Sequence, residues 1–171
     1  DDFLIEHTDL EQIFHKPVLY EGNPVLRPDR EWEKLGRGET AMPFSDGVWY
    51  DPADKHFKMW YMAGYCEATA LAVSRDGVHW DKPDWGVEPG TNIVLKHGRD
   101  SSSIVLDPRD PAPKRRFKMF STQGETTPLE ARLSPDGIHW SDVVARGDRG
   151  NGGRHTVFYN PFRKVWVFSL R

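Results

Sequence analysis

Three positions along this chain carry side chains that could do acid–base chemistry, and they recur at regular intervals. Asp46 and Asp100 are 54 residues apart, and His155, preceded by Arg154, follows Asp100 after a further 55 residues. Each position stands directly before a short run with strand character. If these runs are the innermost strands of a repeated fold, their first residues converge at one end of a central channel. Two carboxylates there can activate water or act as nucleophile, which is the chemistry of glycosidic bond hydrolysis.

Basic and aromatic neighbours complete this candidate site. Arg99, next to Asp100, is expected to keep a carboxylate ionised or to bind substrate hydroxyl groups. Arg154 and His155 are the substrate-binding candidates of the third unit. Each candidate also has a purely structural alternative. Asp46 precedes a glycine and could cap a turn, Asp100 could be a loop residue paired with Arg99, and a lone His at a strand start is often a hydrogen-bonded structural residue.

The elements that must position these residues repeat along the chain. Phe57-Lys58-Met59 recurs sixty residues later as Phe117-Lys118-Met119. At the same offset, Ser74-Arg75-Asp76-Gly77-Val78-His79-Trp80 recurs as Ser134-Pro135-Asp136-Gly137-Ile138-His139-Trp140. A fixed period of this length indicates that one supersecondary unit is built repeatedly.

Each unit is predicted to be a small antiparallel sheet. Its runs are short, aromatic and β-branched, and they end at Asp-Pro, Asn-Pro or Asp-Gly turn signals. Asp-Gly supplies the positive φ values of a tight turn, while the Ser and Asp side chains can accept hydrogen bonds from its amides. Four strands per unit of fifty to sixty residues is typical of a β-propeller blade, and it fits a solenoid or a β-sandwich less well.

The sequence therefore predicts an all-β β-propeller, of which this chain covers about two and a half to three blades. Residues 1–43 are expected to form an extended or short helical lead-in, and residues 44–171 a partial propeller. The blades are placed roughly at 44–97, 98–150 and, incomplete, 151–171. Because a closed ring needs more blades, the remaining blades are expected from missing sequence or from another chain.

Composition narrows the partners. A net charge of −3 with scattered basic residues gives no footprint for nucleic acid, and no apolar run is long enough to cross a membrane. The start shows no signal-peptide pattern, so the location is left open, with a secreted or periplasmic protein compatible with a removed signal. The single Cys66 forbids an intrachain disulfide. No cofactor is expected, and no ligand cluster calls for a metal.

One stretch carries a family resemblance. Ser45-Asp46-Gly47-Val48-Trp49-Tyr50, followed after a turn by Phe57-Lys58-Met59-Trp60-Tyr61, resembles the first blade of the five-bladed glycoside hydrolases of families 43, 62, 32 and 68. Arg99-Asp100-Ser101 is similar to the Arg-Asp-Pro motif of the family 32 group, with Ser in place of Pro. The resemblance implies a five-bladed propeller that cleaves a glycosidic bond of a polysaccharide or oligosaccharide.

By this resemblance Asp46 is the general base or nucleophile, and Asp100 orients substrate and stabilises the transition state. Some relatives also hold a structural calcium ion in the channel. The chain departs from the family at the third inner strand, where Gly153-Arg154-His155-Thr156 stands in place of a catalytic Glu. His155 could serve as the acid, or the acid lies in the absent blades. The alternatives are a non-catalytic carbohydrate- or protein-binding propeller, and a sialidase-like enzyme suggested by the Asp-Gly-Trp turn.

Overall fold

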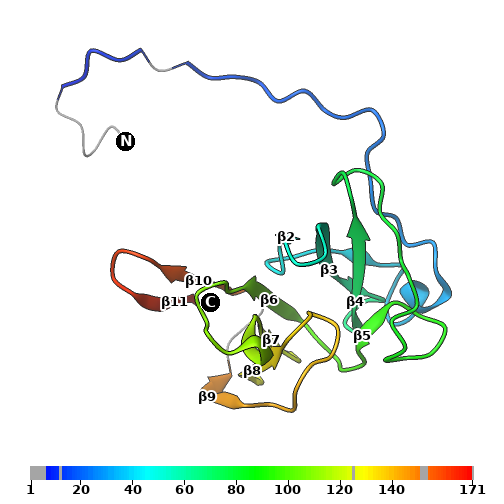
Figure 1. The fold of residues 1–171 in the computed structure, drawn as a ribbon. Helices are drawn as coiled ribbons and strands as arrows, with labels where there is room; N and C mark the ends of the chain where they lie inside the picture. Colours follow the sequence, from blue (N-terminus) through cyan, green and yellow to red (C-terminus); the bar gives the residue numbers. More distant parts are fainter. Residues whose placement is uncertain (1–6, 12, 125, 151–153, 171) are drawn as a thin grey trace.

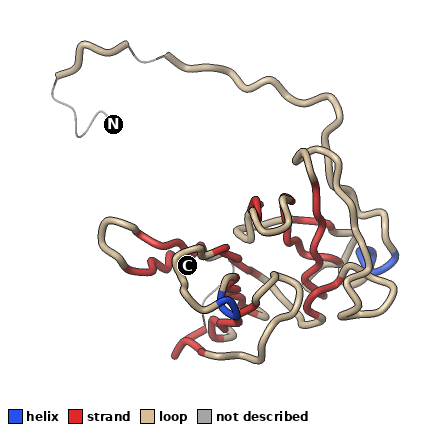
Figure 2. Tube along the Cα trace, viewed as in Figure 1, coloured by secondary structure: helices blue, strands red, loops and turns tan. Residues whose placement is uncertain are grey.

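Short apolar runs separated by Pro, Asp and Gly fold into antiparallel sheets in this protein. The computed structural model describes residues 7–11, 13–124, 126–150 and 154–170. Within these residues the only helical segments are two short 3-10 turns, Glu31–Lys34 (η1) and Pro113–Arg115 (η2) (Figures 1 and 2). The predicted all-β class is therefore confirmed.

The first sheet has an interrupted innermost strand. Its members are β1 (Ala41–Met42), β2 (Val48–Asp51), β3 (His56–Ala63), β4 (Ala68–Ser74) and β5 (Ile93–Leu95). Both β1 and β2 pair with β3, β3 pairs with β4, and β4 pairs with β5, all antiparallel. In the interruption, Gly47 has a φ of +74°. A side chain is disfavoured at this φ, so the chain needs glycine to turn into β2.

The second sheet and a following hairpin continue the same order of elements. The second sheet is β6 (Ser101–Leu106), β7 (Phe117–Thr122), β8 (Pro128–Ser134) and β9 (Ala145–Gly150), and the hairpin is β10 (Thr156–Asn160) with β11 (Val165–Ser169). Each strand pairs antiparallel with the next one in sequence. Three successive units are thus visible (Figure 1), and across the described residues they do not close into a ring.

The pairing register defines which residues of the first two units are equivalent. Met59 lies opposite Val48 in the first sheet, and Met119 lies opposite Ile104 in the second. The third strands agree, because β3 and β7 are sixty residues apart in sequence. The inner strands, however, are only 56 residues apart (48 to 104). The difference arises because the turn between the first two strands is four residues longer in the second unit.

The repeated Ser-x-Asp-Gly turns are built by the predicted side-chain contacts. Ser74 Oγ accepts a hydrogen bond from the Gly77 amide at 2.8 Å. Asp76 Oδ1 accepts from the amides of Val78 and His79 at 2.9 and 2.8 Å. The second copy makes the same three bonds at 2.8, 2.8 and 2.9 Å. The turn geometry is therefore set by residues within a seven-residue segment.

The main core lies between the first and second sheets. Its fully packed members are Trp60, Leu71, Val94, Ile104, Leu106, Phe117 and Met119. Burial of each such aliphatic or aromatic side chain stabilises the fold by about 1.5–3 kcal/mol. Two indoles also bond across the interface: Trp60 Nε1 donates to the carbonyl of Gly137 at 2.8 Å, and Trp49 Nε1 donates to that of Ile104 at 2.7 Å. These contacts fix the two sheets side by side.

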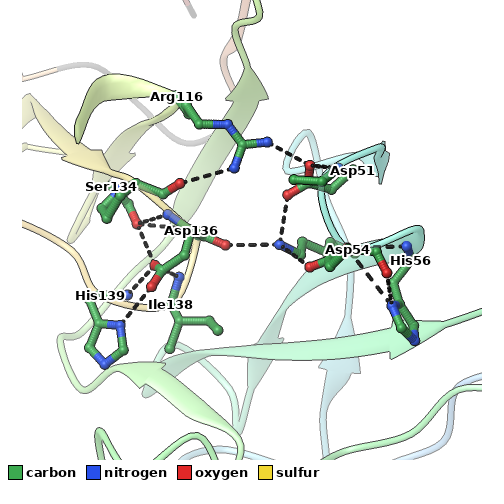
Figure 3. Close-up of polar contacts among 12 residues, drawn as sticks. Asp51, Asp54, His56, Arg116, Ser134, Asp136, Ile138 and His139 are labelled. Carbon is green, nitrogen blue, oxygen red and sulfur yellow. Dashed lines mark hydrogen bonds and ion pairs between the residues drawn. The ribbon is translucent and has the colours of Figure 1, made fainter. Parts of the chain in front are cut away.

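A charged network at the rim of the same interface joins the first sheet to the turn of the second (Figure 3). The buried Lys58 ammonium contacts Asp51 at 2.9 Å and Asp54 at 2.8 Å, and it donates to the carbonyl of Asp136 at 3.0 Å. Arg116 donates to the other oxygen of Asp51 at 2.6 Å. Burial alone would raise the pKa of Asp51, but the bonds from Lys58, a backbone amide and Arg116 outweigh it and lower that pKa.

The lead-in reaches the first sheet through η1. Residues 13–30 contain no helix or strand and run as an extended arm (Figure 1). Beyond them, Glu33 in η1 is fully buried, and it accepts hydrogen bonds from the Tyr61 hydroxyl and the Lys82 ammonium, both at 2.7 Å. The lead-in is thus tied to the first sheet by a buried carboxylate.

Candidate functional site

The predicted residues Asp46, Arg99 and His155 come together at the heads of the inner strands. Asp46 precedes β2, Arg99 precedes β6 and His155 precedes β10, and β6 lies next to both β2 and β10. All three side chains are withdrawn from solvent, with exposed fractions of 0, 2 and 0%. Three sheets therefore contribute one polar side chain each to a single buried location.

A buried ion pair joins two of these sheets. Arg99 Nη2 donates to Asp46 Oδ2 at 2.8 Å, and Arg99 Nη1 lies 3.5 Å from the hydroxyl of Thr69. Asp46 thus turns its carboxylate to Arg99, and the arginine pairs with this carboxylate instead of its neighbour Asp100. Desolvating two charges costs several kcal/mol, which their attraction offsets only with good geometry and further hydrogen bonds. Such a pair is consequently a marker of a specific site more than of stability.

The register changes one expectation about phase. Counted back from β2, β6 and β10, the residues equivalent to Asp46 are Ser102 and His155. The predicted equivalence of Asp46 with Asp100 is wrong by two residues, because the regular spacing ignored the longer turn of the second unit. Asp46, Ser102 and His155 are the three residues that occupy the same place in successive units.

Buried polar atoms without a protein partner gather at the same location. Among the described residues, five of the six such side-chain atoms are Asp46 Oδ1, Arg99 Nε, Ser102 Oγ, Thr122 Oγ1 and His155 Nδ1. We call these five residues the head cluster. Each unpaired buried donor or acceptor costs about 1–3 kcal/mol, and native proteins contain few of them. A concentration of five in one place is therefore a site prepared for a polar ligand or ordered water.

His155 is held in a defined orientation. Its Nε2 lies 3.0 Å from the carbonyl of Phe120, to which it can only donate, and its amide donates to Ser101 Oγ at 3.3 Å. Burial lowers the pKa of His155, and the nearby charge of Arg99 acts in the same direction. At neutral pH the ring is therefore uncharged, with its proton on Nε2 and a lone pair on Nδ1. In this state Nδ1 accepts a hydrogen bond and has no proton to donate.

Asp100 lies at the edge of this region, where it is open to solvent. It is half-buried, and its amide donates to the carbonyl of Thr122 at 2.8 Å. A pocket of about 470 Å³ beside it is lined by Gly36, Arg37, Tyr65, Cys66, Glu67, Asp100, Gln123 and Gly124. The pocket borders the head cluster, because the carbonyl of Cys66 accepts the amide of Arg99 at 3.2 Å. Arg154, by contrast, is exposed, with a φ of +70°.

One charged group in this region escaped the sequence analysis. Glu130, on β8, is buried and contacts Arg132 at 2.9 Å, Arg146 at 3.0 Å and His97 at 3.4 Å. Burial would raise the pKa of Glu130, but the bond from Arg132 and the surrounding positive charges outweigh it and lower that pKa. Glu130 is thus ionised at neutral pH and cannot act as the missing acid. The only signal in the sequence is that two charged residues alternate along a strand.

Comparison of the chain with protein-family models, curated protein sequences and solved structures finds no match. The part of the chain that the structure describes also contains no group of three or more His, Cys, Asp or Glu side chains arranged to hold a metal ion. None of its helical segments has the length and hydrophobicity that crossing a membrane requires. The function must therefore be argued from the head cluster itself.

Proposed function

We propose that the three units are consecutive blades of a five-bladed β-propeller and that the head cluster with its bordering pocket is a carbohydrate site, where a glycosidic bond is hydrolysed. The observation that carries the proposal is the convergence of five unpartnered polar atoms from three sheets. They include acceptors on Asp46 and His155, a donor on Arg99, and hydroxyl groups that can do either. A polyhydroxylated ligand offers both donors and acceptors, so it satisfies such a mixed set.

Each candidate then has a chemical role. Asp46, which is ionised in its pair with Arg99, is the general base or nucleophile through its unpaired Oδ1. Arg99 holds that carboxylate and offers Nε to a substrate oxygen. Asp100 orients the sugar from the pocket, and Nδ1 of His155 accepts a hydrogen bond from a substrate hydroxyl. Arg154 is a further candidate for substrate binding, at the exposed start of β10.

The proposal is tested by substituting each carboxylate in the full chain. Asp46→Asn and Asp100→Asn are assayed on a panel of aryl glycosides, beside Asp142→Asn as a matched change at an exposed aspartate. Loss of a base or nucleophile is expected to lower turnover by about 10²-fold or more, with Asp142→Asn unchanged. Equal turnover of Asp46→Asn and the unsubstituted protein on a cleaved glycoside would remove the catalytic assignment.

A second candidate function is carbohydrate binding without catalysis. It is favoured by the state of the two groups that could have supplied a proton: the pKa of His155 and that of Glu130 are both lowered. Neither group holds a transferable proton at neutral pH, whereas glycoside hydrolysis needs one at the leaving oxygen. Calorimetric binding of oligosaccharides that are left uncleaved, and that Asp46→Asn and Asp100→Asn fail to bind, would select this function.

A further inference from the structure

A second pocket, apolar and distinct from the head cluster, lies beside β11. It measures about 400 Å³ and is lined by Phe120, Leu129, Ala131, Ala145, Arg146, Gly147, Phe168 and Leu170. Phe168 and Leu170 are 42 and 45% exposed. Within the described residues β11 pairs only with β10, so its other edge offers free backbone groups. An apolar pocket next to a free strand edge is the arrangement to which an added strand binds.

The molecule already contains an occupied version of this pocket. By register, Phe120 is equivalent to Trp60, and Trp166 is equivalent to Phe117. The ring centroids of Trp60 and Phe117 are 5.4 Å apart, and those of Phe120 and Trp166 are 5.9 Å apart. Hence β11 sits against β7 as β7 sits against β3. The pocket beside β11 corresponds to the place that β8 and its turn fill beside β7.

At that occupied place the turn makes close contacts that only glycine allows. Gly137 has a φ of +81°, and a Cβ added there would lie 2.4 Å from a ring carbon of Trp60. Its carbonyl accepts the indole N–H of Trp60 at 2.8 Å. By contrast, a Cβ at Gly77, the same position in the first unit, would meet nothing within 4 Å. The Asp-Gly turn is thus the part of a unit that covers the aromatic residue of the preceding unit.

We propose that the pocket beside β11 binds a polypeptide strand that pairs with the free edge of β11 and ends in an Asp-Gly turn placed over Phe120. Backbone pairing supplies the direction, and the glycine supplies the close approach to the ring. Phe120 has no N–H, so this contact lacks the hydrogen bond made by Trp60 and depends on packing. The existing contact of Phe120 with Phe168, at 5.2 Å between ring centroids, makes the new surface continuous with an established interface. The proposal does not depend on the proposed activity.

The test uses the full chain, labelled with ¹⁵N, and an unlabelled peptide with the sequence of residues 128–141, which carries a strand and its turn. Saturable shifts are expected at the amides of Val165–Ser169, Leu170 and Ala145. A peptide with valine in place of the turn glycine is expected to bind about tenfold more weakly, a loss of about 1.4 kcal/mol.

Two variants of the protein localise the contact. Phe168→Asp is expected to weaken peptide binding by about tenfold, whereas Phe162→Asp, at a 94% exposed position in the hairpin turn, leaves it unchanged. If Phe168→Asp disturbs the amides of β10, Phe168→Ala replaces it. Absence of saturation at about 1 mM peptide, shifts centred on other strands, or equal loss in both variants would overturn the proposal. Concentration-dependent shifts at the same amides without peptide would assign the pocket to a second copy instead and also overturn it.

Discussion

Arg99 and Asp46 form an ion pair at 2.8 Å that links the first inner strand to the second, although 53 residues separate them in the sequence. Both side chains are shielded from solvent, and each keeps one polar atom unpaired, Nε on the arginine and Oδ1 on the aspartate. The pair therefore does two things at once. It fixes the heads of two sheets, and it leaves a donor and an acceptor for a ligand.

Breaking this pair is expected to destabilise the protein strongly. Arg99→Met leaves Asp46 as a buried charge without a partner, which costs about 3–5 kcal/mol of unfolding free energy. Lys96→Met, which removes a pair with Glu88 at a 70% exposed side chain, costs about 0–1 kcal/mol. Urea unfolding measures both. A loss in Arg99→Met no larger than that in Lys96→Met would mean that the carboxylate finds solvent or another partner.

The two turn glycines separate backbone strain from packing. Gly77→Ala and Gly137→Ala share the penalty for a side chain at positive φ, about 1–2 kcal/mol. Only Gly137→Ala also pushes a Cβ into Trp60. We therefore expect Gly137→Ala to lose a further 1–3 kcal/mol or so, measured by thermal or urea unfolding. Equal losses would show that the second sheet can move away from the Trp60 ring at no cost.

His155 gives the stability a defined dependence on pH. Its pKa in the folded protein is lowered by burial, from the value of 6.5 that it has when exposed. As pH falls through 6.5 the unfolded chain takes up a proton that the folded protein does not, so stability decreases until the folded pKa is reached. Above pH 6.5 both states are neutral and this contribution is complete.

The measurement for His155 is the unfolding free energy near neutral pH and about two units below it. His155→Gln, which retains a donor for the Phe120 carbonyl, is expected to lose less stability across this window than the unsubstituted protein. His15→Gln, at an exposed position in the extended arm, is expected to behave like the unsubstituted protein. An imidazole NMR titration of His155 with a midpoint at or above 6.5 would contradict the argument.

Local chemistry could be predicted from the sequence, because its causes lie within a few residues. The Ser-x-Asp-Gly turns formed as expected since Ser74 and Asp76 bond to amides two or three positions away. The order of strands followed from the repeat for the same reason. The phase of the inner strands did not, because it depends on the length of a turn that the repeated motifs leave out.

The candidate site was predicted only in part, because its contacts cross between sheets. Asp46, Arg99 and His155 were chosen correctly as residues of the inner strand heads, yet nothing in the sequence said that Arg99 reaches Asp46 and not Asp100. Ser102 and Thr122 look like ordinary strand residues, and only burial without a partner sets them apart. Glu130 was missed because a buried carboxylate on a strand is visible only when its arginine partners are in place.

The charged network at the base of each hairpin has a consequence for how this chain tolerates change. Lys58 holds Asp51 and Asp54 across seven and four residues, and Lys118 holds Asp107 and Asp110 across eleven and eight. The same clamp thus closes over two loops of different size. Segment length at this tip is free to vary without disturbing the sheet below, which makes the tip the natural place for grafted epitopes and for evolutionary insertions.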